Sequence, residues 1–576
     1  MMHILPAIQA MAQGWLQGRP EIAIFLAIAV GYAIGAIKVG AFKLGGVAGT
    51  LLVALAIGQF GIQIDPLLSR FMFTLFIYAL GFSVAPQFFA SIDRTTWTWM
   101  LLVVIEAVLI VTVTFAAAWI FKLDIGTASG LLAGSATESA MVGTGIEAIG
   151  KLGLSAAAIK ALEANVTTAY ALSYVFSLVA IILFASQLAP WLLRIDLRKE
   201  ARAALARLGG ADLNLEPDQR YSSAPLVSRG YRVTAAAGKT VAALEAQLGG
   251  QAVVQSIRHG QAQMPATGAY LLDVDDEIAV AGLRVSLAGA DRIIGPEIGD
   301  LSDVKFILET RDVVLVHRPM HGLTVDNLLE FLKTAACHGV FLAGITRMQR
   351  DLPATPGSKV RMGDVLRLFG RPDDVARATR LLGVADIPSN VTDFVYCCGG
   401  LVIGILIGMV SISLGTASLS LGSAGALLSG LGLGWLRSLR PTFGRFPAAA
   451  AQLLKDLGLA VFIACIGITS APAVLTLLQT KGWQLPVCAV FISLVPTLAS
   501  VYIGRYVLRI EPAILCGAIA GQHASTPAIN ATEAVAGNTV PVIGYTVTYA
   551  IANILLPLLS PIFVALFAAT HAISSY

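Results

Sequence analysis

Long apolar runs separated by short polar loops occupy both ends of the chain. A helix that crosses a membrane needs roughly 20 mostly apolar residues, because lipid offers its backbone groups no hydrogen-bond partners. Runs of about this length predict five spans in each half of the protein: 21–37, 44–60, 70–90, 97–121 and 162–187, and then 394–412, 419–436, 451–471, 484–504 and 543–568.

One further apolar segment in each half differs from these spans. Segments 126–150 and 512–540 are dense in Gly, Ser and Thr. In the second, Ser525 or Thr526 at the cap followed by Pro527 predicts that a helix begins in the middle of the segment. Its unpaired N–H groups must then face protein, water or an anion. We therefore predict a broken, re-entrant segment in each half.

The two halves also resemble each other in sequence. Phe76–Pro86 matches Phe462–Pro472, and Gly130–Gly134 matches Gly517–Gly521. The matching motifs keep the same order along the chain, which indicates an internal duplication. With five spans and one re-entrant segment in each half, the two repeats would be inverted relative to each other, as in many transporters whose site lies between broken helices.

Composition separates these membrane halves from a soluble middle. Hydrophobic residues make up 56% of the chain and charged residues 13%, which excludes a water-soluble enzyme. Segment 188–392, however, carries 24 of the 39 Lys and Arg residues and 23 of the 35 Asp and Glu residues. Its charges are mixed in sign and do not indicate a nucleic-acid partner. The six cysteines lack metal-ligand spacing, so we expect neither a metal nor another cofactor.

The soluble insert reads as two copies of one small α+β module. Alternating strand patterns and short amphipathic helices occur twice, and the two copies include the stretches Asp275–Gly282 and Gly363–Gly370. The basic stretch that begins at Arg194 places the insert in the cytoplasm. The predicted domains are membrane repeat 1 (1–190), a linker (191–224), module 1 (225–300), module 2 (301–390) and membrane repeat 2 (391–576).

Each module resembles the ligand-sensing C-terminal module of potassium-transport regulators, the TrkA-C or RCK-C type. Together with the duplicated membrane halves and the stretch Ala520–Asn530, the chain resembles the aspartate–alanine exchanger family, which includes dicarboxylate exporters. The family has a Thr-rich turn where this chain has Gln522–Ala524. The resemblance implies an antiporter in the bacterial inner membrane, acting as a homodimer, with modules that regulate transport through a small ligand or self-association. Arg258–Gly260 are candidate contacts for such a ligand.

The two breaks predict a pocket that holds a small anionic substrate on helix ends and hydroxyl groups. The glycines have an alternative role in close helix packing, and His523 is equally a substrate ligand or a packing residue. Asn165, Thr168 and Asn553 either line the pocket or hydrogen-bond neighbouring helices. The predicted site residues are Gly134, Ser135, Ala136, Thr137, Gln522, His523, Ala524, Ser525, Thr526, Asn165, Thr168 and Asn553.

Three function classes follow from these features. The first is an exchanger of small carboxylates, either aspartate against alanine or a dicarboxylate such as succinate. The second is a cation:proton antiporter or channel gated by the modules, which would need carboxylates such as Glu106, Glu138 and Glu163 in its core. Glu106 is costly within an apolar span unless it is paired or protonated, and it serves either coupling or structure. The third is a membrane-embedded enzyme, but the sequence contains no nucleophile–base pair that would support one, so we do not expect an enzyme.

Overall fold

The computed structural model describes residues 14–570 apart from 15, 40–41, 44, 91–96, 209–225, 249–251, 265, 284–286, 299–308, 336, 338, 348–349, 386–390, 415–416, 440–443 and 482. The chain forms two compact units, one from residues 1–204 with 388–576 and the other from residues 205–387. Residues 209–224 of the predicted linker and the boundary between the predicted modules lie outside the described residues.

The first unit is helical, and its helices lie at the predicted spans. Among its described helices, three of each half are long and apolar enough to cross a membrane, namely α4, α5 and α8, and α17, α18 and α21. The helices at the spans are α2 (Pro20–Gly35), α3 (Gly46–Gly58), α4 (Pro66–Ala90), α5 (Trp97–Phe121) and α8 (Ala156–Leu183), and then α15 (Phe394–Gly408), α16 (Ala424–Leu439), α17 (Ala448–Lys481), α18 (Gln484–Tyr502) and α21 (Val540–Thr570).

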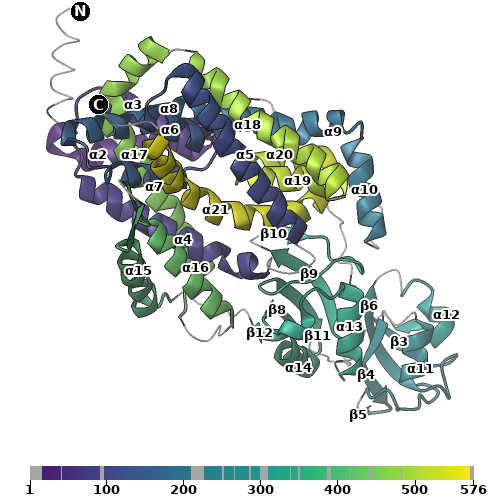
Figure 1. The fold of residues 1–576 in the computed structure, drawn as a ribbon. Coiled ribbons are helices and arrows are strands. Elements are labelled where there is room, and N and C mark those ends of the chain that lie inside the picture. The colour runs from purple at the N-terminus through teal and green to yellow at the C-terminus, as the bar shows by residue number, and fades with distance from the viewer. Residues whose placement is uncertain are drawn as a thin grey trace, which may run out of the picture. The chain divides into compact units, whose positions relative to one another are not determined.

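The same elements recur in both halves. In each half a two-stranded antiparallel ribbon joins the first two helices, β1 (Lys38–Val39) with β2 (Phe42–Lys43) and β13 (Ser411–Leu414) with β14 (Ala417–Ser420). Short π-helices follow α8 and α18, which are not corresponding helices of the two repeats. Helices of the two halves pack against each other throughout the unit, so that α4 lies between α16 and α17 (Figure 1).

Each Gly-rich segment forms two short helices with a break between them. These are α6 (Ile125–Ser135) and α7 (Ala140–Ile149) in the first half, and α19 (Pro512–Gln522) and α20 (Thr526–Ala536) in the second. Gly145 of α7 packs against Ser129 of α6, so closely that a Cβ atom on Gly145 would lie 2.7 Å from the Ser129 Oγ. Ser129 and Gly145 are separated from the break by similar numbers of residues along the chain. Their contact therefore shows that α6 and α7 fold back on each other as a hairpin.

The packing of the following helix agrees with this hairpin. Gly126 of α6 lies against Leu162 of α8, and Gly130 lies against Val166, so α6 and α8 run in the same direction. The connection between two parallel neighbours must return along the molecule, and α7 supplies that return. In the second half, Gly517 and Gly521 of α19 pack in the same parallel sense against Pro541 and Tyr545 of α21.

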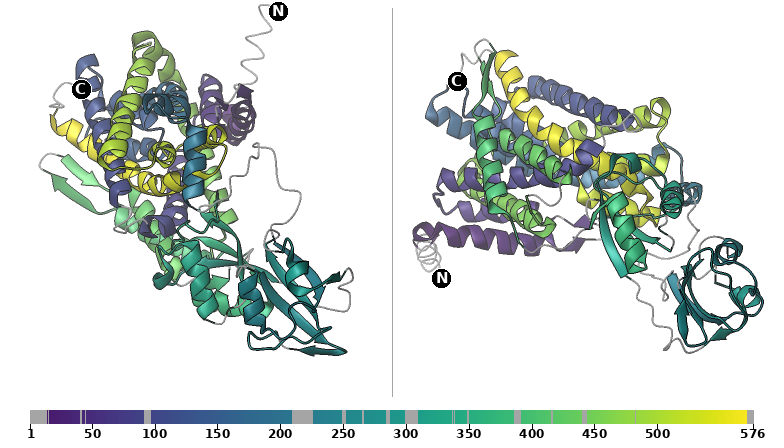
Figure 2. Two further views of the ribbon diagram at one scale, coloured as in Figure 1. Left: turned by 90° about the vertical axis from the view of Figure 1, so that its right-hand side faces the viewer. Right: turned by 90° about the horizontal axis from the view of Figure 1, so that it is seen from below.

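The second unit contains two five-stranded antiparallel sheets of the same topology, and its strands can be followed in Figure 2. One has the order β5-β4-β6-β3-β7 and the other β10-β9-β11-β8-β12. The first sheet comprises β3 (Leu226–Arg232), β4 (Ala252–His259), β5 (Ala262–Met264), β6 (Glu277–Leu283) and β7 (Glu297–Ile298), and the second β8 (Glu309–Leu315), β9 (Phe341–Arg347), β10 (Arg350–Leu352), β11 (Val365–Gly370) and β12 (Gly383–Ala385). Helices α11 (Val241–Gln247) and α12 (Ala290–Ile294) accompany the first sheet, and α13 (Val325–Thr334) and α14 (Pro372–Leu382) the second.

A buried aspartate occupies the same place in both modules. Asp276 and Asp364 precede the strands β6 and β11, and both side chains are fully buried. In module 1 the partner of the aspartate is His259, whereas in module 2 it is Arg347. The insert is therefore a tandem duplication down to the position of single side chains, with a titratable partner in one copy and a permanent cation in the other.

Candidate functional site

The tips of the two hairpins touch each other. The Thr137 hydroxyl in the first tip donates a hydrogen bond to the backbone oxygen of His523 in the second, at 2.6 Å. Thr137 and Ala524 occupy equivalent positions of the repeat, and both have a positive φ, of 55° and 46°. Because residues with side chains rarely adopt this conformation, its recurrence shows that the duplication extends to the backbone of the tips.

Each helix that begins at a tip already has a partner for its first N–H groups. The Ser525 Oγ accepts a hydrogen bond from the amide of Ala528 at 3.3 Å, so Ser525 caps α20. At α7 the carboxylate of Glu138 accepts from the amide of Ala140 at 3.0 Å. The carboxyl group of Glu138 thus occupies the start of α7, where a substrate carboxylate would otherwise be favoured.

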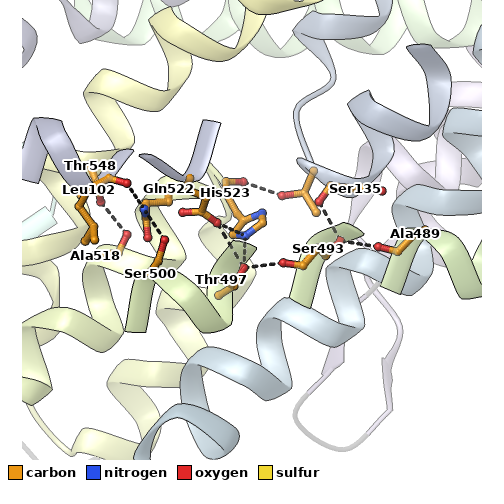
Figure 3. A network of polar contacts seen from close by, with 12 residues as sticks. Leu102, Ser135, Ala489, Ser493, Thr497, Ser500, Ala518, Gln522, His523 and Thr548 are labelled. Atoms are coloured by element: carbon orange, nitrogen blue, oxygen red, sulfur yellow. Dashed lines mark hydrogen bonds and ion pairs between the residues drawn. The ribbon is translucent and has the colours of Figure 1, made fainter. Parts of the chain in front are cut away.

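An acid–base pair between the halves lies directly beside the tips (Figure 3). The Nε2 atom of His523 is 2.8 Å from the Oε1 atom of Glu106 on α5. The Thr497 hydroxyl of α18 lies 2.8 Å from the same nitrogen and 3.2 Å from the same oxygen. Both side chains are almost fully buried, with exposed fractions of 2% for His523 and 6% for Glu106. Glu106 is therefore paired, as its position within an apolar span requires.

Further polar contacts hold the tips against α5 and α18. The side-chain amide of Gln522 donates to the Leu102 oxygen at 3.0 Å and to the Ser500 hydroxyl at 3.3 Å. The Ser493 hydroxyl donates to the backbone oxygen of Ser135 at 2.9 Å. Figure 3 shows this row of polar groups running from one tip to the other. The structure thus brings Ser135, Thr137, Gln522 and His523 of the predicted site into one network.

Several buried atoms of this network lack a hydrogen-bond partner among the described residues. They include the Oε2 of Glu106, the Oε1 of Gln522 and the Nδ1 of His523. These three residues, together with Ala136, line a void of about 10 Å³, which is the size of one water molecule. The tips are therefore closed in this conformation, and a substrate would gain room only if they moved apart.

The remaining predicted residues have other surroundings. The hydroxyl of Thr168 and the amide of Asn553 bond backbone oxygens of their own helices, those of Ala164 and Tyr549. Asn165 is half-buried and Thr526 is exposed. Gly134 and the glycines of α6 and α19 lie tightly against neighbouring helices, which agrees with their alternative role in packing.

A much larger cavity, which the sequence did not predict, is lined in part by α7 of the first hairpin. Its volume is about 750 Å³, and α4, α7, α8 and α17 line it. Its lining includes Gly143, Thr167 and Phe462, and its charged residues are Asp65, Arg70, Glu147, Lys151, Lys160 and Glu163. One turn beyond Thr167, the Tyr170 hydroxyl bonds the Ser139 hydroxyl at the hairpin tip, at 2.7 Å. The cavity therefore reaches to within about one helical turn of the tip.

Comparison with known proteins identifies the helical unit. A family model described as the predicted permease membrane region of the aspartate–alanine exchangers matches residues 23–190 and 396–565, more than half of the chain. The chain belongs to the aspartate–alanine exchanger family. The matched segments are the two membrane halves, so the family resemblance in the sequence is confirmed for them. The family match does not cover the central unit, and the likeness of its modules to potassium-transport regulators stays a prediction.

Bacterial relatives extend this likeness to nearly the whole chain. An uncharacterized transporter of Zymomonas mobilis is 36% identical over 556 residues, which cover 96% of this chain and 98% of the relative. Uncharacterized transporters of Bradyrhizobium diazoefficiens and Francisella tularensis are 36% and 33% identical, over 95% of this chain and 97% of each relative. No solved structure matches the chain. This exchanger-family protein is thus a multi-pass membrane transporter with a central α+β region.

Proposed function

We propose that this transporter exchanges small carboxylates, aspartate against alanine, at the junction of the two hairpin tips. The observation that carries the proposal is the hydrogen bond from Thr137 to the backbone oxygen of His523, because it places two helix breaks of opposite halves against each other. An exchange of dicarboxylates such as succinate is the alternative within the same class. The imidazole of His523 and the start of α20 both favour a carboxylate at this junction.

The direction of the helices supports an inverted arrangement of the repeats in the membrane. Gln522 bonds both Leu102 of α5 and Ser500 of α18. Farther along α5, Glu106 bonds Thr497, which lies earlier in α18 than Ser500. The corresponding helices α5 and α18 therefore run in opposite directions. With both hairpins as re-entrant segments, each half crosses the bacterial inner membrane five times, and the central unit follows the basic stretch 194–202 into the cytoplasm.

The large cavity supplies an aqueous approach to the tips from one side of the membrane. Arg70 and Lys160 line it and would attract an anion, while Asp65 and Glu163 keep the field mixed. The tips themselves are closed around a void of about 10 Å³. We infer that exchange alternates between this closed form and a form in which the tips separate to admit the substrate.

Counterflow into proteoliposomes tests the proposal. Vesicles with the purified protein and unlabelled aspartate or alanine inside should take up labelled aspartate, and empty vesicles should not. If aspartate, alanine, succinate and other common dicarboxylates all fail to exchange, the proposal is wrong. Cation-driven flux that is insensitive to carboxylates would instead support a cation:proton antiporter.

Two variants place the site. His523→Ala removes the imidazole between the tips, and Ser525→Ala removes the cap of α20, so we expect both to lose exchange while inserting normally. Ser83→Ala is a matched control, because the Ser83 hydroxyl is partly exposed and bonds only the Ala79 oxygen of its own helix. Wild-type kinetics in both tip variants would move the site away from the tips.

The central unit is assigned a regulatory role in this proposal, through a small ligand or through association of two chains in a homodimer. The candidate ligand contacts are already engaged within module 1, where Arg258 pairs with Glu277 and His259 with Asp276. A ligand at this place would have to compete with these pairs. Transport that stays unchanged in rate and substrate dependence after excision of the insert would contradict the regulatory role.

A further inference from the structure

Glu106 is isolated among uncharged helices. The described helices α5, α6, α18, α19 and α21 lie around the hairpin tips, and their sequences contain no other Asp, Glu, Lys or Arg. A carboxylate within an apolar span is costly, and such a residue marks a functional position by default. The contacts of Glu106 indicate what that function is.

The internal repeat shows that the fold does not need an acid at this position. The offset in residue number that relates the two tips also relates the first residues of α5 and α18, and by it Ser493 is the counterpart of Glu106. Ser493 donates to the backbone oxygen of Ser135 at 2.9 Å, in the tip of the opposite half. Glu106 likewise reaches the tip of the opposite half, at His523. A hydroxyl therefore suffices to hold a tip in one repeat, and the carboxylate in the other indicates a second role.

The open atoms of Glu106 and Gln522 can only accept hydrogen bonds. The Oε1 of Glu106 contacts His523 and Thr497, while its Oε2 has no partner among the described residues. The side-chain nitrogen of Gln522 is fixed by the backbone oxygen of Leu102, which only a donor can face, so its Oε1 is the open atom. Neither a carboxylate oxygen nor an amide oxygen has a hydrogen to donate. The group that completes both of them must therefore be a donor.

His523 offers the complementary group. In the ion-paired form its imidazolium has a hydrogen on each nitrogen, and Nε2 faces Glu106 and Thr497. Its Nδ1 has no partner in the part of the chain that the structure describes, so the second hydrogen is free to be donated. Glu106, Gln522 and His523 line one void of about 10 Å³, the size of a single water molecule. Acceptors and a donor therefore belong to the same small site.

We propose that the tips bind the α-ammonium and α-carboxylate groups of an amino acid, with Glu106 and Gln522 as the ligands of the ammonium. An ammonium group donates three hydrogen bonds and is about as large as a water molecule, so it fits the void. The α-carboxylate accepts from the Nδ1 of His523, and the rest of the substrate occupies the room that opens between the tips. This inference rests on the proposed exchange of carboxylates and narrows it to amino acids, because dicarboxylates such as succinate have no ammonium group.

An analogue without the ammonium group would be rejected for two reasons. It would leave the open oxygens of Glu106 and Gln522 unpaired, and a second carboxylate there would be repelled by Glu106. A site built to bond a substrate N–H discriminates strongly against an analogue that lacks it, since its buried polar groups then have no partner. We expect a preference of at least about 100-fold for aspartate over succinate and for alanine over propionate.

Competition in the counterflow assay tests this inference on the full chain. In proteoliposomes loaded with aspartate, external alanine should block the entry of labelled aspartate, whereas succinate and propionate should require at least about 100-fold higher concentrations. E106Q keeps the size of the side chain and loses its charge, so it should reduce this preference by about 10- to 100-fold. E106D should retain the preference, and D456N, which changes an exposed carboxylate of α17, should match the wild type.

A measurement on the wild-type protein keeps the inference testable if E106Q does not insert. Because the void has room for one group of the size of water, N-methylaspartate should compete about tenfold or more weakly than aspartate.

Four results would overturn the inference: succinate that competes as well as aspartate, an E106Q variant with the wild-type preference, equal competition by N-methylaspartate, or exchange that requires sodium or lithium and ignores the ammonium group. The last result would assign the open oxygens to a metal cation. The first would leave the exchange of carboxylates in place, whereas the absence of any carboxylate exchange would contradict the proposed function itself.

Discussion

The ion pair between Arg347 and Asp364 in module 2 offers a quantitative test of how burial sets the strength of a charge pair. The guanidinium donates two hydrogen bonds of 2.7 Å to the two carboxylate oxygens. The exposed fractions are 2% for Arg347 and zero for Asp364. Arg347→Ala would leave a buried carboxylate whose remaining bond comes from the amide of Arg361, at 2.7 Å.

The size of the effect follows from that burial. Removing one partner of a buried pair costs about 3–5 kcal/mol, because the other charge stays behind without compensation. The same sheet contains a matched exposed pair, in which Arg367 donates to Asp312 at 2.9 and 3.2 Å with exposed fractions of 57% and 35%. Arg367→Ala should cost about 1 kcal/mol or less, since solvent screens that pair.

Hydrogen exchange followed by mass spectrometry on the full chain measures both effects. Because 1.4 kcal/mol corresponds to a tenfold change, Arg347→Ala should reduce amide protection in β9 and β11 by about 100-fold or more, and Arg367→Ala by about fivefold or less. The double variant R347M/D364L removes both charges and should restore most of the protection. Equal losses in the two single variants would refute the reasoning from burial.

Two further predictions concern module 1 and the hairpins. The hydrogen bond with Asp276 raises the pKa of His259. The stability that this pair contributes is therefore complete below the ordinary histidine range and is lost as the pH rises through the raised pKa. As the pH rises, amide protection of β4, corrected for intrinsic exchange, should fall relative to that of β9. Gly517→Ala would place a Cβ atom 1.8 Å from the Pro541 oxygen and should lower the melting temperature, whereas Gly432→Ala meets open space and should not.

The sequence was sufficient to predict most of the fold, because its main signals are local. Apolar runs placed most of the spanning helices within about five residues of their observed ends, although α17 continues to Lys481 and α8 begins at Ala156; the start signal at Ser525 and Pro527 located the break before α20. Whether each Gly-rich segment runs straight through the unit or folds back as a hairpin was harder to predict, because a spanning helix and a hairpin have the same composition. Close contacts such as that of Gly145 with Ser129 decide it, and these depend on the packed structure.

The site was predicted less completely, because half of it comes from helices without a break. Ser493, Thr497 and Ser500 bond the hairpin tips, and their spacing of four and three residues places them on one face of α18. That spacing is a signal the sequence contained. The pairing of Glu106 with His523, in contrast, joins positions far apart in the chain and could be read only from the fold.

The distribution of tight and polar contacts indicates which parts of the transporter must separate. The glycines of α6 pack directly against the backbone of α8, and those of α19 against that of α21, so each of these pairs behaves as one body. The contacts between opposite halves at the tips are instead hydrogen bonds of single side chains, such as those of Thr137 and Ser493. Hydrogen bonds of this kind can be exchanged for bonds to water or substrate, whereas a close backbone packing cannot. If the substrate binds at the tips as proposed, room for it opens where these side-chain hydrogen bonds between the halves are broken.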